Sequence, residues 1–498
     1  MDESGQSTTR LTGVQWLIIV IASIGFAFDT YELLMTPLAA PPAIAEMLQV
    51  PLNHPSVTDW TGRLLWISAL CGGVFGLLGG WLTDRLGRKF VMASAIFVYS
   101  FSPMLAAYST NLGLFIFFRC TTFIGVCVEF VAAITWLAEV FQEKSQKEKW
   151  LGITQAFASV GGLMVTGVNV WIVAHAADLP AMGLPLALGA TAPATWRYLL
   201  MTGLMPALPI ALLLPFVPES QVWRDRKRAG TLKRPSFAAI FSPELRRVTL
   251  ITAGLSACAY GVAFGALQLT PLRIAPGLPE LAAQNKELAP MRKEAAELNK
   301  QFDQTQPGSP ERKEIVEKVK ANRAKQAPFD KIVKEKANSV QLYQELGGLA
   351  GRIALALLVI AAIPRRLLLR LFQVPGLVAV PLAYFYLFKQ GADVFAWGIA
   401  LVGFVTVAQF SYFGEYLPKV FPLHLRATGG SFATNVGGRM IGTSAAFLTT
   451  NLVAPMLADG PVLPMHVAKA AGCVGLAIVV IGLVLGLFLP EPKAEATD

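Results

Sequence analysis

Twelve apolar segments of membrane length constrain this sequence more than any other feature. A helix needs about 20 mostly apolar residues to cross a bilayer. Such segments occupy residues 13–36, 62–82, 90–108, 112–136, 151–175, 196–217, 247–270, 341–363, 369–388, 393–415, 428–452 and 467–489. Only 15% of the residues are charged and the mean hydropathy is +0.53, which is too apolar for an ordinary soluble domain. The sequence therefore predicts an all-α membrane protein with twelve transmembrane helices.

Basic residues in the short loops predict the orientation, because Lys and Arg concentrate in cytoplasmic loops. If the N-terminus is cytoplasmic, one side of the membrane collects Arg85, Arg88, Lys89, Lys144, Lys147, Lys149, Arg224, Arg226, Lys227, Arg228, Lys233, Arg234, Arg365, Arg366, Arg370, Lys419 and Arg426. We expect a multi-pass protein of the plasma (inner) membrane with both termini in the cytoplasm. The polar first ten residues are not a cleavable signal peptide, so we expect the first helix to remain. These loops also account for the net charge of +10, and no motif indicates nucleic-acid binding.

A charged middle segment divides the apolar segments into six and six. We expect an N-terminal bundle over residues 1–217, a cytoplasmic linker over 218–246, a C-terminal bundle over 247–489 and a cytoplasmic tail over 490–498. A short internal repeat supports this division, since the pattern Val-Gly-Gly-x-Met occurs at residues 160–164 and again at 436–440.

Residues 276–340 depart from the compact plan. Their apolar residues recur at helical spacing on both sides of a breaker, QTQPGSP, which predicts an extramembrane helical hairpin inserted between helices 7 and 8. The segment holds 13 bases and 10 acids, and such long loops are largely exempt from the positive-inside rule. It is either a solvated spacer or a module that docks a partner or covers a gate.

Ionisable residues within the predicted spans are candidates for function, because charge is costly there, and five of them stand out. They are Asp29, Glu32, Arg119, Glu129 and Arg439. At 1.5 Å per residue, Asp29 lies about 24 Å above the cytoplasmic start of its helix, and Arg119 about 10 Å below the outer start of its helix. These depths nearly coincide in a core of about 30 Å. The pair is either a proton switch or a structural ion pair.

The stretch GWLTDRLGRK, residues 80–89, is a short polar turn between two spans. Its bases alone fit an ordinary positive-inside loop, with Gly87 closing the turn and Gly80 admitting a neighbouring backbone. The spacing G-x-x-x-D-R-x-G-R-K resembles the loop signature between helices 2 and 3 of the major facilitator superfamily of secondary transporters. That resemblance implies gating roles for Gly80, Asp84, Arg85, Gly87 and Arg88.

Further motifs resemble the sugar porters and the metabolite or aromatic-acid proton symporters of this superfamily. They are RCTTFIG (119–125), PESQVW (218–223), LPEPK (489–493) and FPLHLRATGGSFATNVGGRMIG (421–442), which includes Arg426 as a further gating residue. In the proton-driven sugar porters, an Asp matching Asp29 faces an Arg matching Arg119. Gln268-Leu-Thr-Pro stands where true sugar porters have paired glutamines, and this departure argues against sugar specificity.

The roles of the remaining acids are less constrained. Glu32 lies one turn beyond Asp29 and either shares the proton site or lies near the outer interface. Glu129 is either a packing residue or a gating residue. We therefore group Asp29, Glu32 and Arg119 as proton-coupling residues and Glu129 with the gating residues.

The expected solute site lies near the midplane between the two halves. Its candidate residues are Gln155, Tyr260, Gln268, Gln409, Tyr412, Asn435 and Arg439. Buried Arg439 either favours an anionic ligand or binds backbone carbonyls or a cytoplasmic acid.

The sequence has no phosphate loop, HExxH or GxSxG motif, and its four histidines form no ligand cluster, so we expect neither an enzyme nor a metal site. We expect a monomeric carrier that moves a small polar solute, more an organic acid than a sugar, by proton symport with no cofactor besides the proton gradient. A proton-coupled sugar symporter and a non-transporting receptor with a partner-binding hairpin are the alternatives.

Overall fold

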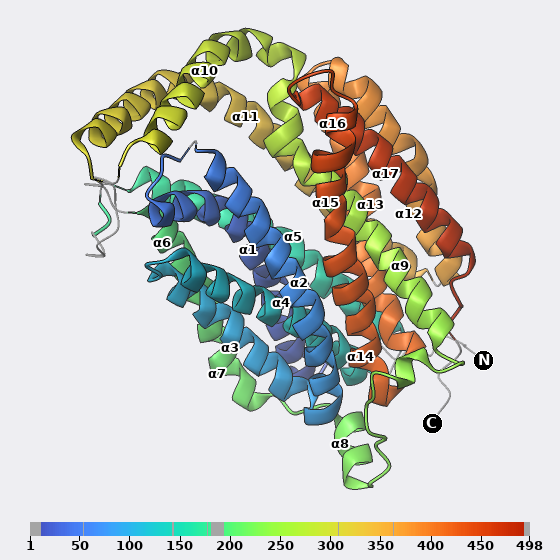
Figure 1. Ribbon diagram of the computed structural model, residues 1–498. Coiled ribbons are helices and arrows are strands. Elements are labelled where there is room, and N and C mark those ends of the chain that lie inside the picture. The colour runs from blue at the N-terminus through green and yellow to red at the C-terminus, as the bar shows by residue number, and fades with distance from the viewer. Residues whose placement is uncertain are drawn as a thin grey trace.

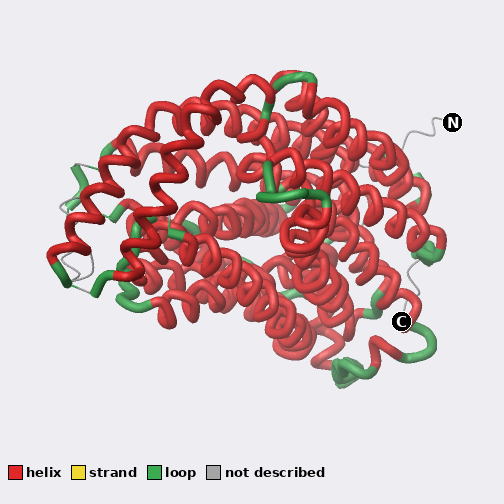
Figure 2. The backbone as a smooth tube through the Cα atoms, turned by 45° about the horizontal axis from the view of Figure 1, so that its top comes forward, coloured by secondary structure: helices red, strands yellow, loops and turns green. Residues whose placement is uncertain are grey.

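A computed structural model of the chain describes residues 11–52, 54–141, 144–176, 178–180, 194–306, 308–361 and 363–492. All regular secondary structure in these ranges is helical (Figure 2). The α-helices are α1 Gly13–Leu48, α2 Pro55–Leu86, α3 Arg88–Ala107, α4 Leu112–Val140, α5 Lys144–Ala174, α6 Thr195–Met201, α7 Ala207–Leu213, α8 Gln221–Arg228, α9 Arg246–Val262, α10 Ala282–Gln304, α11 Pro310–Ile360, α12 Arg365–Pro381, α13 Ala392–Val420, α14 Arg426–Ser431, α15 Ala445–Phe447, α16 Ala454–Met456 and α17 Pro464–Leu487.

Eleven helical segments of the described chain are long and apolar enough to cross a membrane, and they coincide with eleven of the predicted spans. The predicted span 428–452 differs because it is built from consecutive short α, π and 3-10 turns, including the π-helical stretch Phe432–Ile441. Glycines at 429, 430, 437, 438 and 442 weaken the α-helical preference of this segment. Such π insertions are frequent at functional sites.

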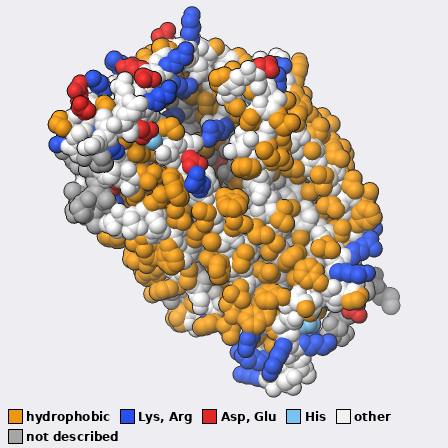
Figure 3. Space-filling view, in the orientation of Figure 1, with side chains coloured by type: hydrophobic (Ala, Val, Ile, Leu, Met, Phe, Trp, Pro, Cys, Tyr) orange, Lys and Arg blue, Asp and Glu red, His pale blue; other side chains and the backbone are white. Residues whose placement is uncertain are grey.

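The buried apolar residues form separate cores in the two halves of the chain. One cluster draws its members from α1 to α7, and two others draw theirs from α9 to α17. Apolar side chains cover the sides of the molecule, while Lys and Arg gather around α8 at one end and on α10 and α11 at the other (Figures 1 and 3). We call these the α8 end and the hairpin end.

The repeated Val-Gly-Gly-x-Met pattern allows a close helix–helix contact in both halves. A Cβ on Gly161 of α5 would lie 1.8 Å from the carbonyl oxygen of Ala27 in α1. A Cβ on Gly437 would lie 2.3 Å from the carbonyl oxygen of Ala253 in α9. Each glycine therefore lets its helix touch the first helix of its own half, as expected for an internal repeat.

The sequence predicted a hairpin over residues 276–340 and a separate span over 341–363. In the structure the hairpin and the span are continuous. Helix α11 runs unbroken for 51 residues, from Pro310 to Ile360. A helix of that length extends about 76 Å, more than twice a bilayer core of about 30 Å. Its first half pairs with α10 and lies over the N-terminal helices (Figure 1).

The tip of the hairpin docks on the turn between α1 and α2. Leu298, Phe302, Ile315 and Val319 form a small buried cluster against which Val50 packs. The buried His54 makes a 3.0 Å hydrogen bond from Nε2 to Asp303 Oδ1. Since His54 Nδ1 accepts from the amide of Ser56, Nε2 is the nitrogen that donates to the carboxylate.

Phe302→Ala should release the hairpin tip from this turn. Phe302 is 1% exposed, and truncating a buried Phe costs about 3–5 kcal/mol. Hydrogen exchange should accelerate around residues 298–304 and remain slow in α4 and α13. Ile332→Ala, at a side chain that is 41% exposed, is the matched control. Unchanged protection in Phe302→Ala would mean that the cluster does not hold the tip.

Glu280 anchors the base of the hairpin to the start of α13. Its carboxylate accepts from the amide of Ala392 at 2.9 Å and lies 3.4 Å from Lys336 Nζ. The amide hydrogen bond, followed by Lys336, lowers the pKa of Glu280. A lowered folded pKa means that this stabilisation is complete above the unfolded value of about 4.5 and is lost as the pH falls below it.

Glu280→Gln should therefore lower the thermal unfolding temperature at pH 7. The difference from the unmodified protein should shrink at pH 4, because the unmodified carboxyl then loses its charge as well. Thermal unfolding of both proteins in detergent at the two pH values measures this. A difference that stays constant between them would exclude a charge effect at Glu280.

Candidate functional site

A buried polar network at the α8 end joins the two halves. The carboxylate of Asp84, at the end of α2, accepts hydrogen bonds from the amides of Ala427 and Thr428 at 3.1 and 2.8 Å. It also accepts from the Thr428 hydroxyl at 2.8 Å. Because these amides open α14, an acid of the N-terminal half caps a helix of the C-terminal half.

Arg88 extends the network. Its Nη2 lies 3.0 Å from Glu139 Oε1 and 3.4 Å from Asp84 Oδ1, and it donates to the Leu423 carbonyl at 3.0 Å. Glu139 also receives Arg426 Nη1 at 3.3 Å. The side chains of Asp84, Arg88 and Glu139 are fully buried, so each charge depends on its partners.

The C-terminal half repeats part of this arrangement. Glu219 accepts from the amides of Arg88 and Lys89 at 3.0 and 3.1 Å, and Glu491 likewise accepts from the amides of Arg365 and Arg366 at 3.2 and 2.9 Å. Arg365 pairs with Glu415 at 3.1 Å, as Arg88 pairs with Glu139. Ala361 stands four residues before Arg365, where Asp84 precedes Arg88. The C-terminal half therefore has no acid at the position that corresponds to Asp84, the residue that caps α14.

The two signature glycines have the geometry that their spacing suggests. Gly87 has a φ of +117°, and a Cβ on it would lie 2.4 Å from Glu219 Oε2. A Cβ on Gly80 would lie 2.6 Å from the Ala427 carbonyl oxygen. Arg85 differs from the other predicted gating residues, because it is exposed and stacks on Trp81 at 4.9 Å.

Arg119 pairs with Glu32 in the interior. Its Nη1 lies 3.8 Å from Glu32 Oε2, and its Nη2 donates to the Glu32 carbonyl at 3.2 Å and to the Thr36 hydroxyl. The expected partner, Asp29, makes no ion pair with Arg119 among the described residues. All of these side chains are buried.

Asp29 belongs to a second group, closer to the α8 end. Its carboxyl is in electrostatic contact with Glu129 of α4 and with Arg439 of the C-terminal half. Neither carboxyl has a hydrogen-bond donor among the described residues. Glu129, which we expected at the gate, therefore lies in the interior beside α1, where a Cβ on Gly25 would meet its Oε1 at 2.3 Å.

Arg439 reaches across the interface between the halves. Its guanidinium lies over the rings of Phe130 and Phe123 in α4, at 5.3 and 5.9 Å, and donates to Asn435 at 3.4 Å. Asn435 in turn donates to the Cys127 carbonyl at 3.1 Å. We call Asp29, Glu32, Arg119, Glu129 and Arg439 the interior charge cluster.

A further contact across the interface involves Gln155. Its carbonyl accepts from Arg352 of α11 at 3.0 Å, and its side-chain amide, which abuts Gly414, has no partner among the described residues. Half-buried Arg352 also bonds Ser411 at 3.1 Å and interacts with Glu345. Arg352 and Glu345 were not among the predicted site residues, although both lie inside the predicted span 341–363. Their charge within a span is the signal that could have identified them.

The other predicted solute ligands are dispersed. Tyr260 packs against Phe410 at 4.7 Å, and Gln409 donates to its own helix at the Val405 carbonyl. Gln268 lies between the π-helical turns Ala263–Leu267 and Thr270–Ile274, where the seventh span, which begins with α9, is irregular. Tyr412 stacks on Tyr416, whose hydroxyl donates to the Pro490 carbonyl at the α8 end. Of these residues, Asn435 bonds Arg439, and Tyr260 interacts with Arg439 electrostatically, so the structure groups both with the interior charge cluster.

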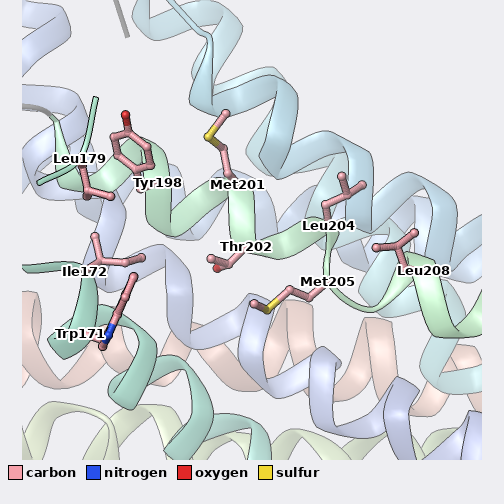
Figure 4. A pocket seen from close by; sticks show the side chains of 9 residues that line it. All are labelled: Trp171, Ile172, Leu179, Tyr198, Met201, Thr202, Leu204, Met205 and Leu208. Carbon is pink, nitrogen blue, oxygen red and sulfur yellow. The ribbon is translucent and has the colours of Figure 1, made fainter. Parts of the chain in front are cut away.

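One surface cavity is a poor solute site. It has a volume of about 390 Å³ and lies between the end of α5, α6 and α7 (Figure 4). Its lining is almost entirely apolar, and Trp171, Met205 and Leu208 are at least half exposed. Such an open groove suits contact with lipid better than binding of a polar solute.

The apolar helices, the ion pairs between the halves and the buried interior carboxyls define a helical membrane protein of two halves with charged groups in its interior. The chain belongs to the Major Facilitator Superfamily, whose family model matches residues 15–285, more than half of the 498 residues. The family is one of transporters and not of enzymes.

The fold is similar to solved symporter structures. The proton:xylose symporter XylE bound to 6-bromo-6-deoxy-D-glucose gives a TM-score of 0.66 at 14% identity and covers 96% of this chain and 97% of its own. The Escherichia coli fucose:proton symporter FucP gives 0.60 at 14% identity, covering 96% and 99%. At these identities the likeness concerns the fold alone.

Relatives by sequence include transporters of acids. The sialic acid transporter NanX of Escherichia coli is 24% identical over 48% of this chain and 52% of its own length. The niacin transporter NiaP of Acinetobacter baylyi is 22% identical over 41% of each. The 4-hydroxybenzoate transporter PcaK of Pseudomonas aeruginosa is 34% identical over 35% and 36%. The chain thus spans about half the length of these relatives or less.

Proposed function

We propose that the protein is a proton-coupled symporter of a small organic acid. The main supporting observation is the interior charge cluster, in which three buried carboxyls and the Arg119 guanidinium of the N-terminal half lie near Arg439 of the C-terminal half. Fully ionised, it has one negative charge in excess. Burying an unpaired charge is expensive, so the cluster favours one bound proton.

Asp29 and Glu129 form the proposed proton site. Two carboxylates in contact within a low-dielectric interior repel each other, and a shared proton removes this repulsion. Glu32 and Arg119 form the adjacent neutral ion pair. Asp29 thus keeps its proposed coupling role, with Glu129 as its partner in place of Arg119.

Arg439 links the proton to the solute. A solute carboxylate that binds its guanidinium competes with Asp29 for the same positive charge. The acids then retain a proton more readily, because their negative charge has lost its counter-ion. Binding of an organic anion and binding of a proton therefore favour each other, which is the requirement for symport.

The proposed topology has twelve spans in two six-helix bundles, with the irregular segment 428–452 as the eleventh. The hairpin lies outside the membrane, because α11 is too long for a bilayer core. The α8 end is cytoplasmic, since Arg226, Lys227 and Arg228 lie there. The side chains of Lys144, Lys147 and Lys149, and all of residues 493–498, lie outside the described residues. A monomer in the plasma membrane with cytoplasmic termini completes this proposal.

The α8-end network closes the cytoplasmic side in the proposed transport cycle. Opening it requires Asp84 to leave the start of α14 and Arg426 to leave Glu139. The two bundles then expose the interior charge cluster to the cytoplasm. Alternating access by rocking of the two bundles fits the separate cores of the halves.

Uptake into proteoliposomes tests the proposal. Labelled 4-hydroxybenzoate, niacin, sialic acid and xylose are offered under an inward proton gradient, with gradient-free vesicles as the control. Accumulation of a carboxylate, but not of xylose, is the expected result. Accumulation of xylose alone would identify a sugar symporter, and no flux with any solute would favour the receptor interpretation.

A further inference from the structure

A cavity of about 620 Å³ lies at the base of the hairpin, away from the interior charge cluster. Its walls come from α10, α11, residues 271–276 at the outer end of the seventh span, the segment around Thr450 and Asn451, and the start of α17. Thr450 lies eleven residues beyond Arg439 along the chain, or about 16 Å in helical rise. The volume falls in the range of sites that hold small molecules.

The cavity is cationic. Its lining includes Arg273, Arg292 and Lys334 but a single acid, Asp330, which lies 3.8 Å from Arg292. Arg273 and Lys334 make no ion pair with any residue that the structure describes. Two positive charges in the lining therefore remain for a ligand.

Neutral polar groups accompany these charges. Asn338, Gln341 and Asn451 also line the cavity. Guanidinium, ammonium and amide groups all donate hydrogen bonds, which suits oxyanions. An organic acid that carries a carboxylate and a hydroxyl or ring nitrogen matches this set.

The structure also holds these walls in place. Glu280 fixes the hairpin base to α13, while the His54–Asp303 hydrogen bond and the cluster around Phe302 fix the tip to the N-terminal half. Figure 3 shows the surface hollowed between the hairpin and the C-terminal helices, with Lys and Arg side chains near the hollow. A solute that approaches from the hairpin end meets these cations first.

We propose that this cavity is an outer binding site for a small organic anion, which collects the solute before it reaches Arg439. The inference rests on the proposed function for its choice of solute. The same chemistry would also hold the phosphate headgroup of an anionic lipid, because Leu272, at 69% exposure, lines the cavity beside Arg273. The experiment separates these two sources.

The test compares two double variants of the full-length protein. Arg273→Gln with Lys334→Gln removes both unpaired charges of the cavity. Arg323→Gln with Lys325→Gln makes the same charge change at exposed residues of the hairpin that do not line the cavity. Binding and uptake of labelled 4-hydroxybenzoate are measured in phosphatidylcholine membranes at low salt and at high salt.

The cavity variant should raise the KM about fivefold with little change in maximal rate, and the effect should fade at high salt. The hairpin control should match the unmodified protein. Equal KM values in the two variants would overturn the proposal. A defect that appears only when phosphatidylglycerol is present would assign the cavity to lipid and would also overturn it.

Equilibrium binding separates this proposal from the proposed function. If 4-hydroxybenzoate is not transported, its binding should still weaken in the cavity variant and persist in Arg439→Gln. That pattern would support the outer site while the proposed function fails. Binding that is equal in all variants, or undetectable in each of them, would overturn the outer site.

Discussion

Asp29→Asn is expected to abolish proton-driven accumulation and to leave solute exchange intact. The amide keeps the shape of the buried side chain but cannot take up a proton. For one proton carried with one monovalent anion, a gradient of about one pH unit supports about tenfold accumulation, since 1.4 kcal/mol corresponds to a factor of ten. The variant should equilibrate the solute to a ratio of about one.

The measurement is the steady-state ratio of labelled solute inside and outside proteoliposomes, together with counterflow in preloaded vesicles. Asp59→Asn, at a side chain that is 56% exposed and paired with Arg63, is the matched control. Glu129→Gln should show the same loss as Asp29→Asn. The double variant should add little, because the two carboxyls act as one proton site.

Full accumulation of the solute by Asp29→Asn would contradict the proposed proton site. The Glu32–Arg119 pair would then be the next candidate, tested by Glu32→Gln. Loss of both accumulation and exchange would indicate that Asp29 has a structural role, as a partner of Arg439. The counterflow measurement therefore separates coupling from folding or solute binding.

Arg88→Ala should open the α8 end and lower uptake by at least an order of magnitude. The substitution leaves Asp84 and Glu139 buried with one cation fewer, and breaking a buried pair in this way costs about 3–5 kcal/mol. In the variant, the two halves should separate at the contact that Asp84 makes with the start of α14 in the unmodified protein. Transport requires both states, so a carrier that rests open to the cytoplasm turns over slowly.

Labelling of Cys127 reports this opening. The thiol is fully buried, and the Cys127 carbonyl accepts from Asn435 at the interface between the halves. In a background with serine at the other four cysteine positions, a membrane-impermeant maleimide applied from the α8 side should react several-fold faster in Arg88→Ala. Arg85→Ala, at the exposed neighbour that stacks on Trp81, is the matched control.

Arg88→Lys guards against a folding defect, because it keeps one positive charge while losing the forked geometry. It should recover part of the uptake and slow the labelling of Cys127. Normal uptake and slow labelling in Arg88→Ala would show that the network does not hold the α8 end closed. Arg426→Ala, which removes the weaker link to Glu139, should have a smaller effect in the same direction.

Much of the fold followed from local properties of the sequence. Hydrophobicity over about 20 residues is sufficient to place a membrane helix, and eleven of the predicted spans appear as helical segments. The segment 428–452 is helical, as predicted, but it alternates between α, π and 3-10 turns and is not one α-helix. Gly87 and Gly80 were also predictable, because a turn and a close approach are requirements of the backbone at their own positions.

The motifs predicted some residues of the α8-end network but not the acids that pair with them. Asp84, Arg88 and Arg426 were expected there, whereas Glu139 and Glu219 were not. Glu219 lies inside PESQVW, which we recognised as a motif without assigning a role to its acid. The second acid of this kind, Glu491, occupies the corresponding place in LPEPK.

By itself, the sequence determined the class of protein, the approximate depth of each buried charge and the family to which the motifs belong. The tertiary structure alone decided that Arg119 pairs with Glu32, that Glu129 lies with Asp29, and that the hairpin is docked through His54. Depth along a helix is only one of three coordinates. Asp29 and Glu32 differ in depth by about 4.5 Å, and the rotation and packing of the helices decide which carboxyl meets which guanidinium.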